Sequence, residues 1–162
     1  EDPLNILKKR YALGEITKKQ FEKMKKEIRW SVAMKTEDFA YIVETKKSFD
    51  DAVVSVLKAV EQKDRTLFQI YDVKERLAAK GFEQKPLKII EICSGKYANQ
   101  FLNKNRLISL CMPCKINVLE ENKKVKIVGM KPTTISQFFP EVNKEEAEEV
   151  ERDVKEIVDN AR

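Results

Sequence analysis

The sequence predicts an α+β protein, a two-layer sandwich of a mainly antiparallel sheet with helices, preceded by an α-helical hairpin. Two observations lead to this prediction. Beyond residue 38, short apolar segments of strand length alternate with short helical patterns. The first 29 residues instead contain two consecutive amphipathic helical patterns without a strand between them. We therefore expect a hairpin over residues 1–29, a junction over 30–36 and an α+β domain over 37–162.

The predicted hairpin has distinct start and stop signals. Asp2 is a suitable N-cap ahead of Pro3, and Thr17 with Gln20 forms a capping box for the second helix. Gly14 is a suitable end for the first helix. So few large apolar side chains cannot stabilise this segment alone, so we expect it to pack on something. The side chains predicted to form this interaction surface are Leu4, Leu7, Tyr11, Phe21, Met24, Ile28 and Trp30.

The junction contains Trp30, the only tryptophan of the chain. It lies beside the apolar residues 32–34, so we expect it to seal the hairpin against the main body by simple packing. The alternative is that Trp30 anchors a partner chain.

The first half of the α+β domain alternates strands with capped helices. Strands are predicted over 39–43, 67–71 and 87–93. Ser48 with Asp51 begins a buried helix, Asp72 with Glu75 begins a short helix that ends at Gly81, and another short helix is expected over 96–103.

The second half contains a long apolar stretch, residues 107–119, with Pro113 in its middle. A proline at this place requires an edge strand, a bulge or a break between two strands. A turn at 121–122 and a strand over 125–130 follow. Asn143 with Glu146 then caps a final helix, whose apolar stripe is Ala147, Val150, Val154, Ile157 and Val158.

Composition excludes several classes of enzyme. The chain has 162 residues, 36% of them charged, and no histidine, so it contains no Ser-His-Asp or Cys-His machinery and no His-bound metal centre. Four glycines cannot build a glycine-rich phosphate loop. The longest uncharged run, residues 132–140, is too short to span a membrane. We predict no cofactor, and we do not expect an enzyme.

The net charge of +5 is unevenly distributed: residues 1–30 carry +4, residues 31–130 carry +5 and residues 131–162 carry −4. The basic stretches lack the interleaved aromatic residues of an RNA-stacking sheet, so we interpret them as solvated helix faces and disfavour a nucleic-acid partner. An odd number of cysteines in a chain rich in Lys and Glu indicates a reducing cytoplasm. The same richness in Lys and Glu is typical of thermophilic proteins.

The hairpin carries a recognisable motif. Residues 2–25, DPLNILKKRYALGEITKKQFEKMK, resemble the SHOCT module, a short helical hairpin usually found at C-termini. The resemblance extends to about residue 29 and implies an interaction or oligomerisation element. This chain differs in carrying the module at its N-terminus.

The α+β domain resembles the DUF 302 family over residues 38–132, and the terminal helix extends this resemblance to about residue 160. The segments that carry it are YDVK (71–74), LAAKGF (77–82), IIEIC (89–93), MPCK (112–115) and MKP (130–132). The family implies a small α+β unit with an antiparallel sheet and no agreed activity.

Sulfur is the only distinctive chemistry of the chain. The family pattern places cysteines where Cys93 and Cys114 stand, while Cys111 lies outside that pattern and creates a CxxC with Cys114. Three roles remain open: a redox thiol pair, a soft-metal site for Zn²⁺ or Cu⁺, and small buried apolar residues. If residues 107–114 are extended, Cys111 and Cys114 point to opposite faces unless Pro113 inserts a bulge, which favours burial of Cys111.

The sequence therefore predicts a non-enzymatic binding or oligomerisation module. We expect a homo-oligomer, with a dimer favoured, and no membrane span; the ligand stays unidentified. The alternative is a thiol-based redox or soft-metal protein that uses Cys93 and Cys114. A nucleic-acid binder is the third and weakest class.

Overall fold

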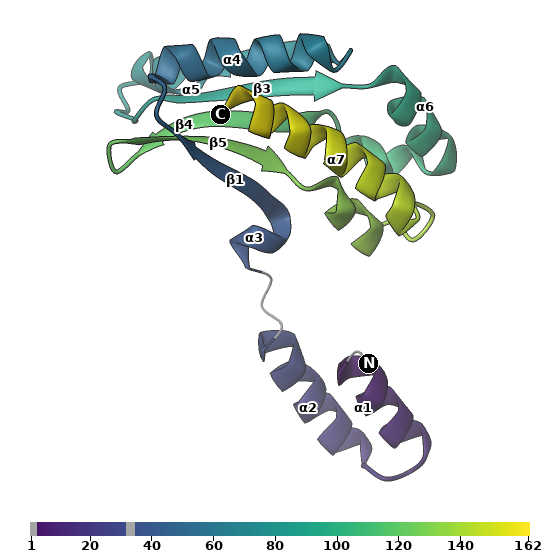
Figure 1. Cartoon of the computed structure of the whole chain (residues 1–162). Helices are drawn as coiled ribbons and strands as arrows, with labels where there is room; N and C mark the ends of the chain where they lie inside the picture. Colours follow the sequence, from purple (N-terminus) through teal and green to yellow (C-terminus); the bar gives the residue numbers. More distant parts are fainter. Residues whose placement is uncertain (1–2, 32–34) are drawn as a thin grey trace. The chain divides into compact units, whose positions relative to one another are not determined.

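The computed structural model describes residues 3–31 and 35–162, and only the backbone of residues 29–31. The chain forms two compact units, Glu1–Lys35 and Thr36–Arg162 (Figure 1). The predicted cap Asp2, the side chain of Trp30 and residues 32–34 of the predicted junction lie outside the described part of the chain.

The first unit is the predicted pair of helices, α1 (Pro3–Ala12) and α2 (Lys18–Ser31). Gly14 adopts a φ of +74° in the connection, a conformation that glycine adopts without steric cost. The Thr17 amide donates to Gln20 Oε1 at 2.9 Å, and the Gln20 amide donates to Thr17 Oγ1 at 3.3 Å. Both bonds confirm the predicted capping box, which satisfies amides that would otherwise lack partners in the first turn.

The hairpin leaves much of its apolar surface uncovered within its own unit. Leu7 and Ile16 are buried, and the Tyr11 and Phe21 rings stack with their centroids 4.9 Å apart. An open groove of about 340 Å³ runs between the two helices and is lined by Pro3, Ile6, Leu7, Arg10, Met24, Glu27 and Ile28. Of the predicted surface, Leu7, Met24 and Ile28 line this groove, whereas Tyr11 and Phe21 pack on each other.

The second unit contains the sheet and the remaining helices. In chain order its elements are α3 (Thr36–Phe39), β1 (Ala40–Thr45), α4 (Phe49–Gln62), β2 (Thr66–Asp72), α5 (Val73–Ala78), β3 (Leu87–Cys93), α6 (Gly95–Lys104), the 3-10 helix η1 (Arg106–Cys111), β4 (Cys114–Glu121), β5 (Lys124–Met130), the 3-10 helix η2 (Pro132–Gln137) and α7 (Lys144–Ala161).

The five strands form one antiparallel sheet in the order β1-β5-β4-β3-β2. Helices α4 and α7 lie together on one face of it (Figure 1). Alternate strand residues point to that face, so the core consists of the two helix stripes and the inward strand residues Ile90, Ile92, Ile116, Val118 and Ile127. The predicted α+β sandwich is therefore confirmed.

Of the outcomes expected at Pro113, the structure has a break, but the segment before it is not a strand. The apolar stretch does not continue as a strand through Pro113: residues 106–111 form η1, and β4 begins only at Cys114. The Asn105 side chain accepts from the Leu107 amide at 2.9 Å and so caps this 3-10 helix. Periodicity within a short apolar run cannot separate a strand from a tight helix, which explains the error.

The 3-10 helix η2 was not predicted from the sequence. The first amide that this helix can donate, that of Thr133, lies against Glu151 of α7, which accepts hydrogen bonds from this amide and from the Thr133 hydroxyl and forms an ion pair with Lys155. Burial opposes ionisation of Glu151, but the bonds from Lys155 and Thr133 outweigh it and keep the pKa of this carboxyl below its ordinary value. Glu151 thus acts as a cap supplied by another element.

Candidate functional site

A cavity of about 40 Å³ lies at the end of the sheet where β3 finishes and β4 begins. Helix α7 supplies Val150, Asp153, Val154 and Ile157 to the cavity walls. Helix α6 supplies Tyr97, Ala98 and Phe101. The two 3-10 helices close the remaining sides with Cys111, Pro132 and Ile135. A space of this size holds roughly three water molecules or a ligand of a few heavy atoms.

The three cysteines of the chain all line this cavity. Cys114 opens β4 opposite Ile92 of β3, and Cys93 ends β3 as the next residue along. Cys111 ends η1, so its side chain comes from a helix rather than from a strand. An extended chain was the condition under which Cys111 and Cys114 would point to opposite faces; the structure does not meet that condition, and both residues line the same cavity.

The two strand thiols are held in their protonated form. Burial is the main reason that the pKa of Cys114 rises to about 11, and the nearness of Cys93 adds to this rise. Burial also raises the pKa of Cys93, although a hydrogen bond from the backbone at Ser94 and the charge of Arg65 oppose it. Both groups are neutral, soft and polarisable near neutral pH.

The charged groups at the cavity neutralise each other. The Arg65 side chain is only 8% exposed and forms an ion pair with Asp153 of α7. Its guanidinium lies over the Tyr97 ring, 5.0 Å from the centroid. Lys63 also approaches Asp153, with Nζ 3.8 Å from Oδ1. Asp153 therefore neutralises the positive charge of Arg65 in the cavity wall, and the Tyr97 ring helps to hold its side chain in place.

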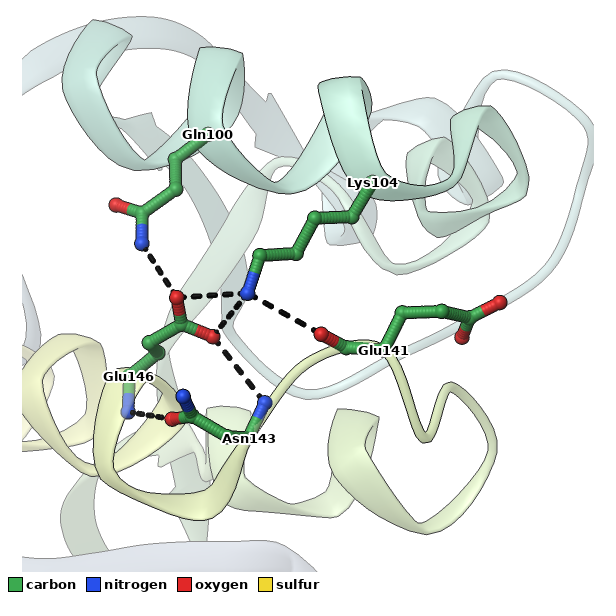
Figure 2. A network of polar contacts seen from close by, with 5 residues as sticks. All are labelled: Gln100, Lys104, Glu141, Asn143 and Glu146. Carbon is green, nitrogen blue, oxygen red and sulfur yellow. Dashed lines mark hydrogen bonds and ion pairs between the residues drawn. The ribbon is translucent and has the colours of Figure 1, made fainter.

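A polar network joins the two helices that line the cavity. Figure 2 shows Glu146 of α7 at its centre, accepting hydrogen bonds from Gln100 Nε2 and Lys104 Nζ of α6, each at 2.7 Å. The same carboxylate completes the predicted capping box with Asn143. The bond from Lys104 is the main reason that the pKa of Glu146 lies below its usual range. Lys104 also donates to the Glu141 carbonyl at 3.1 Å.

We expect Glu146→Ala to lower the free energy of unfolding by about 1 kcal/mol, because it removes the half of the capping box that the Glu146 carboxylate forms with the Asn143 amide. It also removes both side-chain bonds to α6, so amide exchange in residues 95–104 should accelerate relative to the sheet. Urea unfolding and hydrogen exchange measure the two effects. Glu145→Ala is the matched control, since Glu145 is exposed, occupies the same helix turn and takes no part in the network. Equal effects of the two variants would contradict this role for Glu146.

The three predicted thiols thus lie together at one cavity. The sequence analysis did not predict the charged residues beside them, Arg65 and Asp153. Arg65 follows α4 and Asp153 lies on the polar side of α7, and neither has a motif that links it to the cysteines. Within residues 3–31 and 35–162, no group of three His, Cys, Asp or Glu side chains is placed to hold a metal ion. The three thiols therefore do not form a ready metal-binding set.

The second unit, residues 36–162, is similar to known proteins. The family model described as a domain of unknown function, DUF302, matches residues 41–161. The chain belongs to the DUF302 family. A crystal structure of the uncharacterised conserved protein DUF302 from Bacillus stearothermophilus superimposes with a TM-score of 0.72 at 28% identity, covering 80% of this chain and 100% of that one.

The DUF302 unit follows a second recognised module. Residues 2–29 match the model of the short C-terminal domain SHOCT, as expected from their sequence. A search of curated proteins found no match. Across the described ranges, no helix combines the length and apolar character needed to cross a membrane.

Proposed function

We propose that this protein is a non-enzymatic binding module whose DUF302 unit takes a small, uncharged, mainly apolar ligand into the thiol-lined cavity. The observation that carries the proposal is the lining itself: apolar side chains, protonated thiols and a guanidinium already neutralised by Asp153. Such a wall offers dispersion contacts and no unpaired charge, so a charged ligand would lose its hydration without compensation.

Methyl NMR with dissolved xenon as the probe tests this proposal on the full chain. We expect saturable shifts confined to the methyl groups of Ile92, Val150, Val154 and Ile157, and none with acetate as a small anionic probe. Ala98→Leu, which fills the cavity, should abolish the shifts, whereas Ala78→Leu on the exposed end of α5 should leave them intact. Shifts with acetate alone, or unchanged xenon binding in Ala98→Leu, would overturn the proposal.

The hairpin supports an assembly role beside this ligand site. Its groove exposes apolar side chains, of which Ile6 is 43% exposed. Among the described residues of this unit, few apolar side chains are buried. A segment with so small a core gains stability when that groove is covered. We assign to it the oligomerisation role that its sequence predicts, and Ile6→Glu should remove the associated species larger than a dimer from a sedimentation profile.

The second candidate function is thiol redox chemistry, favoured by the convergence of three free cysteines on one cavity. It requires a thiolate near neutral pH, whereas burial raises the pKa of both Cys93 and Cys114. In a chain that keeps Cys114 as its only cysteine, we expect the ultraviolet thiolate band to appear with a midpoint at about pH 11. A thiolate formed at neutral pH would instead favour the redox function.

The raised pKa of Cys114 also predicts how the stability of the protein changes with pH. An unfolded Cys114 loses its proton near the ordinary value of 9.0, while the folded thiol keeps it to about 11. The folded state therefore binds more protons in this range, and stability should fall as the pH rises from 9 towards 11. Cys114→Ala should remove this part of the alkaline loss, which urea unfolding across the range measures.

A further inference from the structure

The sheet face opposite α4 and α7 has a defined pattern of side chains. One residue from each strand lies in a single row across it: Ile42 is opposite Val128, Val128 opposite Asn117, Asn117 opposite Ile89, and Ile89 opposite Tyr71. Four of these five are aliphatic or aromatic. Ile42 is 41% exposed and the others are half-buried, so this central row is an apolar band across the full width of the sheet.

The rows on either side of the band carry both signs of charge. On one side Lys115 and Glu91 are opposite each other, with Nζ and Oε1 3.6 Å apart. On the other side Glu44 is opposite Lys126 and forms an ion pair with Lys124 at 2.8 Å. An apolar centre with a mixed polar rim is the usual anatomy of a protein interface. Because the charges balance, the face complements a copy of itself rather than a polyanion.

Asn117 lies at the centre of this face, in the middle row of the middle strand. Its Oδ1 is buried, and the described part of the chain provides no hydrogen-bond partner for it. A buried acceptor left unpaired is costly. Asparagine carries both a donor and an acceptor, and its terminal torsion is soft, so a rotation that turns Oδ1 outward would let two Asn117 amides pair on a twofold axis.

We propose that this face is a homodimer interface centred on Asn117. The five strands, spaced ~4.8 Å apart with about seven residues each at ~3.4 Å, give a footprint of roughly 600 Å² per copy. Two such faces bury on the order of 1,200 Å², which is enough for a specific but reversible dimer. The interface is independent of the ligand proposed for the cavity, which lies on the helix side of the sheet between α6 and α7.

Sedimentation velocity on the full chain, from about 1 to about 200 μM, tests the proposal. We expect the wild type to reach at least twice the 18.9 kDa chain mass. Ile42→Glu places a carboxylate in the apolar band and should raise the dimer dissociation constant by at least about 100-fold. Val54→Glu is the matched control, because Val54 is a similar side chain, 48% exposed on α4 of the other layer, and it should leave the dimer intact.

Two further variants separate this interface from the hairpin. Asn117→Asp sets like charges against each other on the axis and should weaken the dimer by at least about tenfold. Ile6→Glu changes the hairpin groove and should leave the sheet-mediated dimer in place. A monomeric wild type at the highest concentration would overturn the proposal, as would a dimer that survives Ile42→Glu or one that Ile6→Glu alone dissociates.

Discussion

Gly129→Ala is expected to destabilise the DUF302 unit by about 2 kcal/mol. Gly129 lies on β5 beneath α7, and a Cβ at this position would come within 2.6 Å of Val154 Cγ1 and 3.3 Å of Val158 Cγ2. Both valines are buried, and their branched side chains are stiff, so neither can move aside without disturbing the helix. The close approach of β5 and α7 therefore depends on the missing side chain. Urea unfolding measures the loss.

Two variants make this prediction specific. Gly95→Ala is the matched control, since no heavy atom lies within 4 Å of a Cβ there and the position opens helix α6. It should be neutral or slightly stabilising. The double variant Gly129→Ala with Val154→Ala removes the atom that the new Cβ meets, and should be more stable than the sum of the two single losses predicts. Unchanged stability of Gly129→Ala would contradict the close approach.

Asp153→Asn is expected to cost about 2 kcal/mol, because it leaves the Arg65 guanidinium, 8% exposed, without a charged partner. The stacking of Arg65 on Tyr97 should loosen at the same time, so the cavity wall on α6 becomes less ordered. Urea unfolding gives the energetic loss, and methyl NMR of the cavity residues reports the change in the wall.

The control for the Arg65–Asp153 pair is an exposed ion pair. Lys124 and Glu44 form an ion pair at 2.8 Å with side chains 62% and 51% exposed, so Glu44→Gln should cause no measurable change. Replacing both partners, Arg65→Met with Asp153→Leu, should recover most of the stability that Asp153→Asn loses. If Asp153→Asn and Glu44→Gln behave alike, Arg65 does not depend on its carboxylate.

The predictions that succeeded concern local structure. The capping pairs Thr17 with Gln20, Ser48 with Asp51 and Asn143 with Glu146 all occur, and each bonds across three residues. The strand predicted over 87–93 has the same limits in the structure. These features depend on neighbours a few positions away in the chain, so the sequence contains nearly all the information needed to predict them.

The predictions that failed or were missing concern segments whose conformation depends on distant partners. Residues 106–111 form a 3-10 helix whose buried member Ile108 packs in a cluster with Phe101 and Ile135 from other elements. The helix η2 depends on Glu151, eighteen positions beyond the Thr133 that it caps. No local pattern records such contacts, because tertiary packing overrides short-range preference there.

By itself, the sequence determined the α+β class, the two modules and the element caps, and it identified sulfur as the distinctive chemistry. Only the tertiary structure decided that Cys93, Cys111 and Cys114 share one cavity, that Arg65 is neutralised beside them by Asp153, and that Asn117 occupies the centre of an open sheet face. The reason is physical. Strand order and register bring together residues separated by many positions, and burial then sets the protonation state of those thiols.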